Sequence, residues 1–152
     1  MKSAFFPGSF DPFTLGHQTL VLNALQFADN ILIGIGTNSQ KIPYFTLESR
    51  IKHIESLFEN DTRIQVKQFQ GLAVDFCKTE HLDFIVRGLR DAKDFEYEKS
   101  IAAMNETISG IKTMFLMTEA QYAPINSTIV REIHKNGGII EAFVTNSHLL
   151  VK

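Results

Sequence analysis

Residues 3–36 read SAFFPGSFDPFTLGHQTLVLNALQFADNILIGIG. The segment 3–6 is a short apolar run, which we expect to form a strand that stops at Pro7 and Gly8. Residues 15–28 predict a helix, whose apolar positions include Leu20, Leu22, Ala24, Leu25 and Phe27. Residues 31–36 form a continuous apolar run, which is typical of a strand buried on both faces. The stretch therefore predicts a strand, a helix and a second strand parallel to the first.

The same alternation continues along the chain. Further strands are expected at 64–69, 84–86 and 113–117, of which the first alternates in polarity like a strand near a sheet edge. Helices are expected at 46–58, 72–82, 91–109 and 127–135, and a short one after Asn146 and Ser147. The pattern predicts one α/β domain over residues 1–152, a parallel sheet of about five strands with helices on both faces.

Composition limits the classes of partner. The 152 residues include 15 basic and 17 acidic side chains, a formal net charge of −2, which argues against nucleic acid or an acidic membrane as partner. The single cysteine, Cys77, cannot form an internal disulfide framework and is expected to be a buried structural thiol. Neither a signal peptide nor an apolar run of membrane-spanning length is recognisable. We therefore expect a cytoplasmic protein.

Polar and glycine residues gather where the predicted strands end, which is where parallel sheets bind ligands. After the first strand come Gly8 and Ser9, and then Gly16 and His17 at the start of a helix. Free N–H groups at a helix start favour an anion, and a histidine there can donate a hydrogen bond to a phosphate oxygen. The alternative is a loop of turn-forming residues in which His17 is a solvated cap.

Two further segments have the same chemistry. Arg87 and Arg90 flank Gly88-Leu89 at the end of a strand, where two guanidinium groups can hold different phosphates. Residues 125–131 read INSTIVR, and their hydroxyls and helix-start N–H groups can form an anion site. Taken alone, the first could be a solvated arginine pair and the second an ordinary helix cap.

These segments carry a family resemblance that covers nearly the whole chain. Residues 7–17 resemble the T/HxGH signature of the nucleotidyltransferases, whose Rossmann-like fold is shared with class I aminoacyl-tRNA synthetases. Residues 125–131 resemble the I-S-S-T-x-x-R motif, with Asn126 in place of serine. Arg87-Gly88-Leu89-Arg90, followed by Asp94-Phe95-Glu96-Tyr97-Glu98, resembles the corresponding block of phosphopantetheine adenylyltransferases.

The resemblance implies a reaction and a set of sites. The reaction is reversible adenylyl transfer from ATP to 4′-phosphopantetheine, which gives dephospho-coenzyme A and pyrophosphate. The catalytic residues would be His17, as a hydrogen-bond donor in the transition state rather than a proton carrier, and Lys41, as a phosphate ligand between the substrates. The implied ATP contacts are Ser9, Phe10, His17, Gly88, Leu89, Arg90, Glu98, Tyr122, Ala123, Pro124, Ile125, Asn126, Ser127 and Thr128. The implied phosphopantetheine contacts are Ser9, Lys41, Ala73, Arg87 and Asn105.

The resemblance also implies the cofactor and assembly. Mg²⁺ is expected to be held by ATP phosphates and water, with no ligand from a protein side chain. The family is typically hexameric, so a homo-oligomer is expected. Ser9 stands where threonine is commoner but keeps the hydroxyl. No function is assigned to His53, His81, His134 or His148, which we expect at the surface or at helix caps.

Two other readings stay open on the sequence alone. A cytidylyltransferase or a nicotinamide-mononucleotide adenylyltransferase shares the first signature, but usually has histidine at the position of Thr14 and lacks the block from Arg87 to Asn105. A non-catalytic nucleotide-binding module on a decayed version of the fold is the second. The retained Ser9, His17 and Lys41 argue against such decay.

Overall fold

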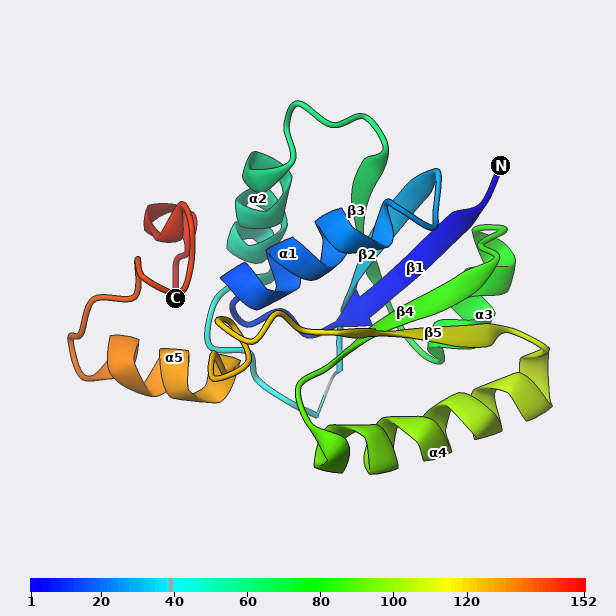
Figure 1. Cartoon of the computed structure of the whole chain (residues 1–152). Helices are drawn as coiled ribbons and strands as arrows, with labels where there is room; N and C mark the ends of the chain where they lie inside the picture. Colours follow the sequence, from blue (N-terminus) through cyan, green and yellow to red (C-terminus); the bar gives the residue numbers. More distant parts are fainter. Residues whose placement is uncertain (39) are drawn as a thin grey trace.

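The computed structural model describes residues 1–38 and 40–152, and within them it forms one parallel sheet of five strands. The strand order is β3-β2-β1-β4-β5, as Figure 1 shows. The strands are β1 (Ser3–Gly8), β2 (Asn30–Gly36), β3 (Ile64–Phe69), β4 (Phe84–Leu89) and β5 (Lys112–Met117). The helices are α1 (Leu15–Ala24), α2 (Leu47–Leu57), α3 (Ala73–Thr79), α4 (Ala92–Ser109) and α5 (Ser127–Lys135), followed by a 3₁₀ turn, η1 (Ser147–Leu149). The predicted fold class and the edge position of β3 are confirmed.

Helices cover both faces of the sheet (Figure 1). One core cluster joins Leu20 and Val21 of α1 and Ile54 of α2 to the sheet. The cluster on the other face joins Val74 and Cys77 of α3 to Phe5, Leu32 and Ile85. The continuous apolar runs of β1 and β2 are explained by this arrangement, because their side chains are buried alternately in the two clusters.

The direction in which successive strands are added to the sheet changes at β1. From β1 the chain goes first to β2 and β3 on one side, and later returns to β4 and β5 on the other. β1 and β4 pair only through Ala4 with Phe84 and Phe5 with Ile85, so they separate toward their carboxyl ends. A crevice outside the strand ends at such a reversal is where open α/β sheets bind ligands.

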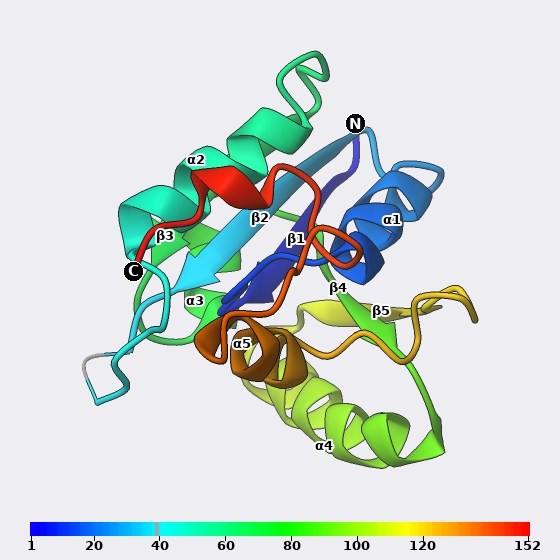
Figure 2. The same cartoon turned by 90° about the vertical axis from the view of Figure 1, so that its left-hand side faces the viewer.

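A third apolar cluster lies beyond the carboxyl ends of the strands. It joins Phe45, before α2, to Val130 of α5 and to Ile140, Val144 and Leu150 of the C-terminal segment. The C-terminal segment is also fixed by the backbone, since Thr46 N–H donates to Val151 O at 2.8 Å. Figure 2 looks onto α5 and this segment, which lies next to α2.

Two predicted strand ends are wrong. β1 continues through Pro7 and Gly8, and the proline is tolerated because the pairing with β4 has already ended at Phe5. β4 continues through Leu89, because Arg87 pairs with Phe115 and Leu89 with Met117 of β5. Arg87 is therefore part of a strand and does not follow one.

Two predicted helices are too long. α1 ends at Ala24 rather than at residue 28, and both Leu22 and Phe27 are about half exposed. The chain turns there so that Asp29 N–H can donate to Lys2 O and align β2 with β1. α3 spans only Ala73–Thr79, and the left-handed backbone of His81 (φ 56°) redirects the chain toward β4. The bounds of α5 and the short C-terminal helix are confirmed.

Candidate active site

A pocket opens at the carboxyl ends of β1 and β4, where the strands diverge. His17, Arg87 and Arg90 line it together, although they lie on α1, on β4 and just after β4. Residues from the segment before α5 complete the wall, so that three separated signatures meet in one cavity. Its full lining is Phe6, Pro7, Gly8, Ser9, Phe10, Thr14, Gly16, His17, Leu20, Arg87, Gly88, Arg90, Thr118, Tyr122, Ile125 and Ser127.

His17 is fixed by the residue that caps its own helix. Thr14 is the N-cap of α1, and its N–H donates to Nδ1 of His17 at 2.9 Å. The Thr14 hydroxyl lies 3.1 Å from the same nitrogen. Because Nδ1 accepts a hydrogen bond, a neutral ring must carry its proton on Nε2.

The surroundings of His17 keep the ring uncharged. Burial, and then the positive charges of Arg87 and Arg90, lower its pKa from 6.5 to about 4. The rings of Phe6, Phe10 and Phe13 lie within 5.2–6.2 Å of the imidazole, centre to centre. At neutral pH the imidazole of His17 is therefore neutral, and its Nε2–H is the hydrogen-bond donor that it contributes to the pocket.

Phe10 also explains the glycine at the end of β1. A side chain at Gly8 would come within 2.7 Å of the Phe10 ring. Phe10 itself has φ 46°, a left-handed backbone that costs energy in a non-glycine residue. A glycine lets a ligand approach the backbone closely, and at position 8 it also leaves room for this ring.

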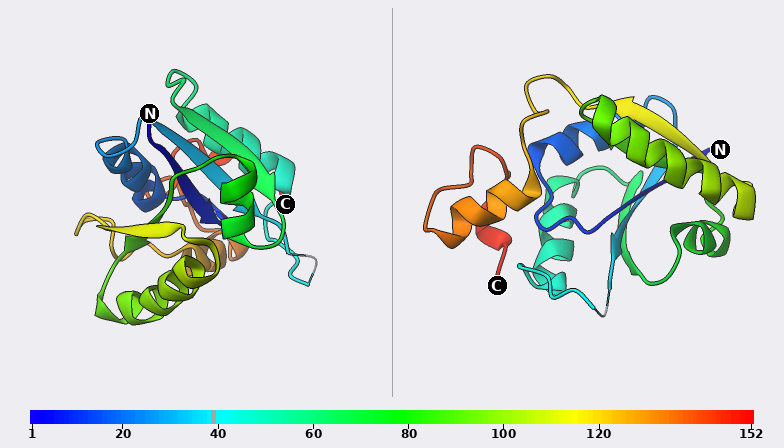
Figure 3. Two further views of the ribbon diagram at one scale, coloured as in Figure 1. Left: turned by 90° about the vertical axis from the view of Figure 1, so that its right-hand side faces the viewer. Right: turned by 90° about the horizontal axis from the view of Figure 1, so that it is seen from below.

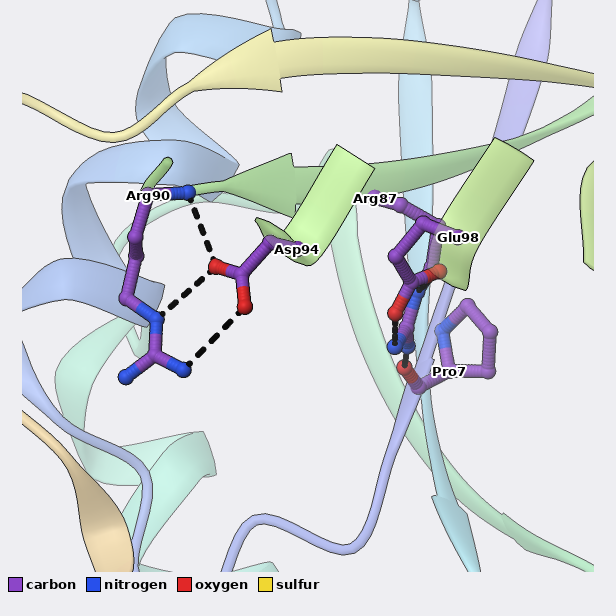
Figure 4. Close-up of polar contacts among 5 residues, drawn as sticks. All are labelled: Pro7, Arg87, Arg90, Asp94 and Glu98. Atoms are coloured by element: carbon purple, nitrogen blue, oxygen red, sulfur yellow. Dashed lines mark hydrogen bonds and ion pairs between the residues drawn. The ribbon is translucent and has the colours of Figure 1, made fainter. Parts of the chain in front are cut away.

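Arg87 reaches across the gap between β4 and β1. Its Nη1 donates to Pro7 O at 2.7 Å, while Nε and Nη2 donate to the two carboxylate oxygens of Glu98 at 3.0 and 2.6 Å (Figure 4). These contacts use three of the five guanidinium N–H groups, which leaves two for a ligand.

Arg90 has a similar partner one turn earlier on α4. Its backbone N–H and Nε donate to Oδ2 of Asp94 at 3.0 and 3.1 Å, and Nη2 lies 3.5 Å from Oδ1 (Figure 4). Asp94 and Glu98 are four residues apart and so lie on one face of the helix. One side of α4 thus supplies a carboxylate to each arginine. Arg90 holds the pKa of Asp94 below its usual value, against the effect of burial.

A second pocket lies on the other side of Arg87 and is mostly apolar. Ala73, Arg87, Glu98 and Asn105 line it, together with Pro7, Gly8, Phe69, Ile85, Ile101, Ala102 and Thr113. Three of these residues, Ala73, Arg87 and Asn105, are the ones that the resemblance assigns to phosphopantetheine. Glu98, which the resemblance assigns to ATP, lies here and contacts Arg87.

Lys41 lines a third pocket, on the far side of Ser9. Its wall is Ser9, Asp11, Gly36, Thr37, Asn38, Lys41, Ile42, Pro43, Tyr44, Leu47, Arg50 and Arg131. Ser9 also lines the first pocket, and Pro7, Gly8 and Arg87 line both the first and the second. The three pockets are therefore neighbours around the carboxyl end of β1.

The start of α5 uses some of its polar groups internally. Asn126 is the N-cap, and its side-chain oxygen accepts the N–H groups of Thr128 and Ile129 at 2.8 and 3.4 Å. Ser127 Oγ donates to Pro12 O at 3.0 Å. Tyr122, Ile125 and Ser127 line the first pocket, whereas Ala123, Pro124, Asn126, Thr128 and Leu89 are outside its lining.

Several residues near the site had no predicted role. Asp94, Asp11 and Arg50 all make contacts in or beside the pockets. The sequence carries a weak signal for Asp94, which belongs to the family block. Nothing in the local sequence marks Arg50, because its contacts lie five and 41 residues away.

Two predictions on other residues have different outcomes. Cys77 is buried as expected, and burial raises the pKa of its thiol to about 12. His53 is not at the surface: it is fully buried, and its Nε2 lies 2.7 Å from Thr145 O. The helix position of His53 faces the C-terminal segment, which covers it.

Two kinds of feature are absent from the part of the chain that the structure describes. No helix there is both long enough and apolar enough to cross a membrane. No group of three or more His, Cys, Asp or Glu side chains in residues 1–38 and 40–152 is placed to bind a metal ion.

A doubly wound parallel sheet with a pocket at its reversal point, lined here by two arginines, is typical of nucleotide-binding proteins. The family model described as Cytidylyltransferase-like matches residues 5–133, which identifies the class as nucleotidyltransferases. Solved structures agree on the fold. A bifunctional NMN adenylyltransferase/ADP ribose pyrophosphatase from Francisella tularensis has a TM-score of 0.73 at 20% identity over 98% of this chain and 46% of its own.

Sequence relatives give the particular family. The phosphopantetheine adenylyltransferases of Christiangramia forsetii and Phocaeicola vulgatus are each 45% identical over 144 residues, which is 95% of this chain and 95% of theirs. That of Lachnoclostridium phytofermentans is 42% identical over 99% of this chain and 93% of its own. The chain belongs to the phosphopantetheine adenylyltransferase family, as the resemblance predicted.

Proposed function

We propose that this enzyme transfers the adenylyl group of ATP to 4′-phosphopantetheine, reversibly, to give dephospho-coenzyme A and pyrophosphate. The family membership supports the reaction. The observation that carries the site assignment is that His17, Arg87 and Arg90 line one pocket, although they come from separate segments. Two polyanionic substrates repel each other, and the guanidinium groups of Arg87 and Arg90 can offset that repulsion beside the neutral N–H donor of His17.

The different linings of the pockets support the assignment of each substrate to its own pocket. ATP would occupy the first pocket, with its phosphates at His17, Arg90 and the start of α5. The pantetheine arm would occupy the second pocket, whose lining is mostly apolar. Arg87 belongs to both and has two N–H groups left, so we place the phosphopantetheine phosphate there. Lys41 and Ser9 would hold phosphate oxygens from the neighbouring side.

The chemistry needs no general base, because the attacking phosphate is already an anion. An oxygen of the phosphopantetheine phosphate forms a bond to the α-phosphorus of ATP. The bond from that phosphorus to the bridging oxygen breaks, and pyrophosphate leaves. Negative charge builds on the α-phosphate oxygens, where the Nε2–H of His17 would donate a hydrogen bond. Its neutral state at pH 7 suits this role and not that of a proton carrier.

Mg²⁺ would enter with ATP, held by its phosphates and by water. The residues lining the first pocket include no carboxylate, and Mg²⁺ prefers oxygen ligands and retains several waters. Bound in this way, it would neutralise part of the triphosphate charge.

We further propose that the enzyme is a homo-oligomer, a hexamer as is typical of its family, that acts in the cytoplasm, without nucleic acid. α4 supports the assembly, because it lies at the outside of the fold (Figure 3). No residue of this 18-residue helix is buried, and Phe95, Ile101, Met104 and Ile108 are exposed. Light scattering coupled to size exclusion would test it, since a monomeric mass would overturn the proposal.

A pyrophosphate-release assay tests the reaction. ATP would be offered with 4′-phosphopantetheine, nicotinamide mononucleotide and other phosphorylated acceptors, each with Mg²⁺ and with chelator. We expect release with phosphopantetheine and a strong dependence on Mg²⁺. Release only with another acceptor would overturn the proposed substrate, and no release with any acceptor would favour a binding module.

A further inference from the structure

Two charged side chains are buried in the part of the chain that the structure describes, and both lie beside the site. Asp11 is 8% exposed and Arg50 is 4% exposed. Burying a charge costs free energy unless hydrogen bonds compensate it. The hydrogen bonds of these two residues therefore indicate which parts of the structure they stabilise. What we infer from them rests on the proposed function.

The carboxylate of Asp11 binds the backbone of another loop. Oδ2 accepts the N–H of Tyr44 at 2.7 Å, and Oδ1 accepts the N–H of Phe45 at 2.9 Å. Asp11 belongs to the loop between β1 and α1, which carries Ser9. Tyr44 and Phe45 end the segment between β2 and α2, which carries Lys41.

The guanidinium of Arg50 forms hydrogen bonds with the same two loops. Its Nε donates to Phe45 O at 3.1 Å, and its Nη1 donates to Ser9 O at 2.6 Å. Asp11 therefore binds N–H groups of the Lys41 segment, and Arg50 binds a carbonyl oxygen on each loop. Arg131 of α5 adds a third anchor, since its Nη1 donates to Asp11 O at 2.7 Å.

We propose that Asp11 and Arg50 are positioning residues that fix the Lys41 segment against the Ser9 loop. Neither needs to touch a substrate. They act by setting the distance between two loops whose side chains would hold phosphates of different substrates. In-line transfer requires such groups to be placed to within a fraction of an ångström, and a shift of about 1 Å can cost a factor of about a hundred in rate.

Hydrogen exchange tests the contacts independently of activity. In Asp11→Asn one oxygen remains to accept, and the amide nitrogen would face the other N–H. We expect the backbone amide of Tyr44 or Phe45 to exchange at least about tenfold faster than in the unaltered enzyme, an effect absent from the control Asp61→Asn. Asp61 is a suitable control because its carboxylate accepts an N–H of Arg63, away from the three pockets.

A double-mutant cycle tests the consequence for catalysis. Asp11→Asn and Arg50→Lys are each made alone and together with Lys41→Ala, and kcat/KM is measured with phosphopantetheine varied. We expect Asp11→Asn and Arg50→Lys to lower it about tenfold or more in the unaltered background, and about threefold or less once Lys41 is absent. Equal losses in both backgrounds would mean a general loss of structure and would overturn the inference.

The outcomes separate the inference from the proposed function. An enzyme that shows no transfer to phosphopantetheine refutes the proposed function, and amide exchange then decides the inference by itself. An active enzyme whose Asp11→Asn and Arg50→Lys variants have unaltered exchange at Tyr44 and Phe45 refutes the inference alone. Should Asp11→Asn not fold, Arg50→Lys supplies both measurements.

Discussion

The two sides of the site are held in different ways. On the β1 side, His17 is fixed by the backbone N–H of a residue three positions earlier and surrounded by phenylalanine rings. On the β4 side, Arg87 and Arg90 are held by carboxylates of α4, and their side chains are about one-third exposed. A rigid neutral donor suits the additional negative charge that builds up on the α-phosphate in the transition state. Arginines paired with carboxylates suit the binding of substrate phosphates, because a phosphate can accept hydrogen bonds from the guanidinium beside the carboxylate or in its place.

The largest effect is expected on the β1 side. His17→Ala removes the only contribution that we assign to the transition state alone, so kcat should fall about a hundredfold or more. Substrate affinities should change much less. Steady-state kinetics with ATP and phosphopantetheine varied in turn would measure both, and a near-normal kcat would contradict the contrast between the two sides.

On the β4 side, Arg87→Ala should act on binding. Loss of charge-assisted hydrogen bonds should weaken phosphopantetheine affinity about tenfold to a hundredfold, while ATP affinity is largely kept. Calorimetric titration with each substrate would measure the two separately. Arg90→Ala is the matched variant, for which we expect the opposite selectivity. If Arg87→Ala weakened only ATP, our division of the pockets would be wrong.

Glu98→Gln sharpens the same comparison. An amide has one acceptor oxygen in place of two, so it cannot make the two parallel hydrogen bonds that the Glu98 carboxylate accepts from Nε and Nη2 of Arg87. Through Arg87, we expect a change of about threefold to tenfold in kcat/KM for phosphopantetheine, with KM for ATP little altered.

Asp94→Asn provides the control for Glu98→Gln, since it alters the corresponding partner of Arg90. It should affect ATP and leave phosphopantetheine nearly unchanged. A raised KM for ATP in Glu98→Gln would instead support the direct nucleotide contact that the family resemblance assigns to Glu98.

The sequence was most informative where local patterns decide the structure. Continuous apolar runs indicated the strands, and the helices expected from residues 15 and 46 begin at Leu15 and Leu47. The end of β4 could not be seen in the same way. Its apolar run stops at Val86, but pairing with β5 continues the strand through Leu89, and that pairing depends on residues far along the chain.

Among the site residues too, those in local motifs could be predicted, and those that depend on distant contacts could not. Ser9, His17, Arg87 and Arg90 lie in short motifs, so the sequence brought them forward together. Asp11 and Arg50 act through backbone groups 34 and 41 residues away, and no local pattern records such a contact. The burial of His53 likewise depends on the return of the C-terminal segment over α2.

The smallest effect expected is a pH dependence of stability on the face of the sheet that α1 and α2 cover. Burial, partly offset by the contact with Thr145 O, keeps the pKa of His53 below 6.5 in the folded state. The unfolded chain therefore binds a proton here more readily. Stability is complete above pH 6.5 and falls as the pH drops below it, by at most about 1.4 kcal/mol per pH unit from this group.

Urea unfolding of the unaltered enzyme and of His53→Gln at pH 7.5, 6.5 and 5.5 would measure this dependence. His17, whose pKa is also lowered, adds a loss of the same sign, so His53→Gln should retain part of the dependence and lose at most about 1 kcal/mol of it between pH 6.5 and 5.5. His81→Asn is the matched control, because that position is exposed and asparagine tolerates its left-handed backbone. Should the control and His53→Gln show the same slope, the His53 imidazole would not contribute to the loss of stability in acid, and this prediction would be wrong.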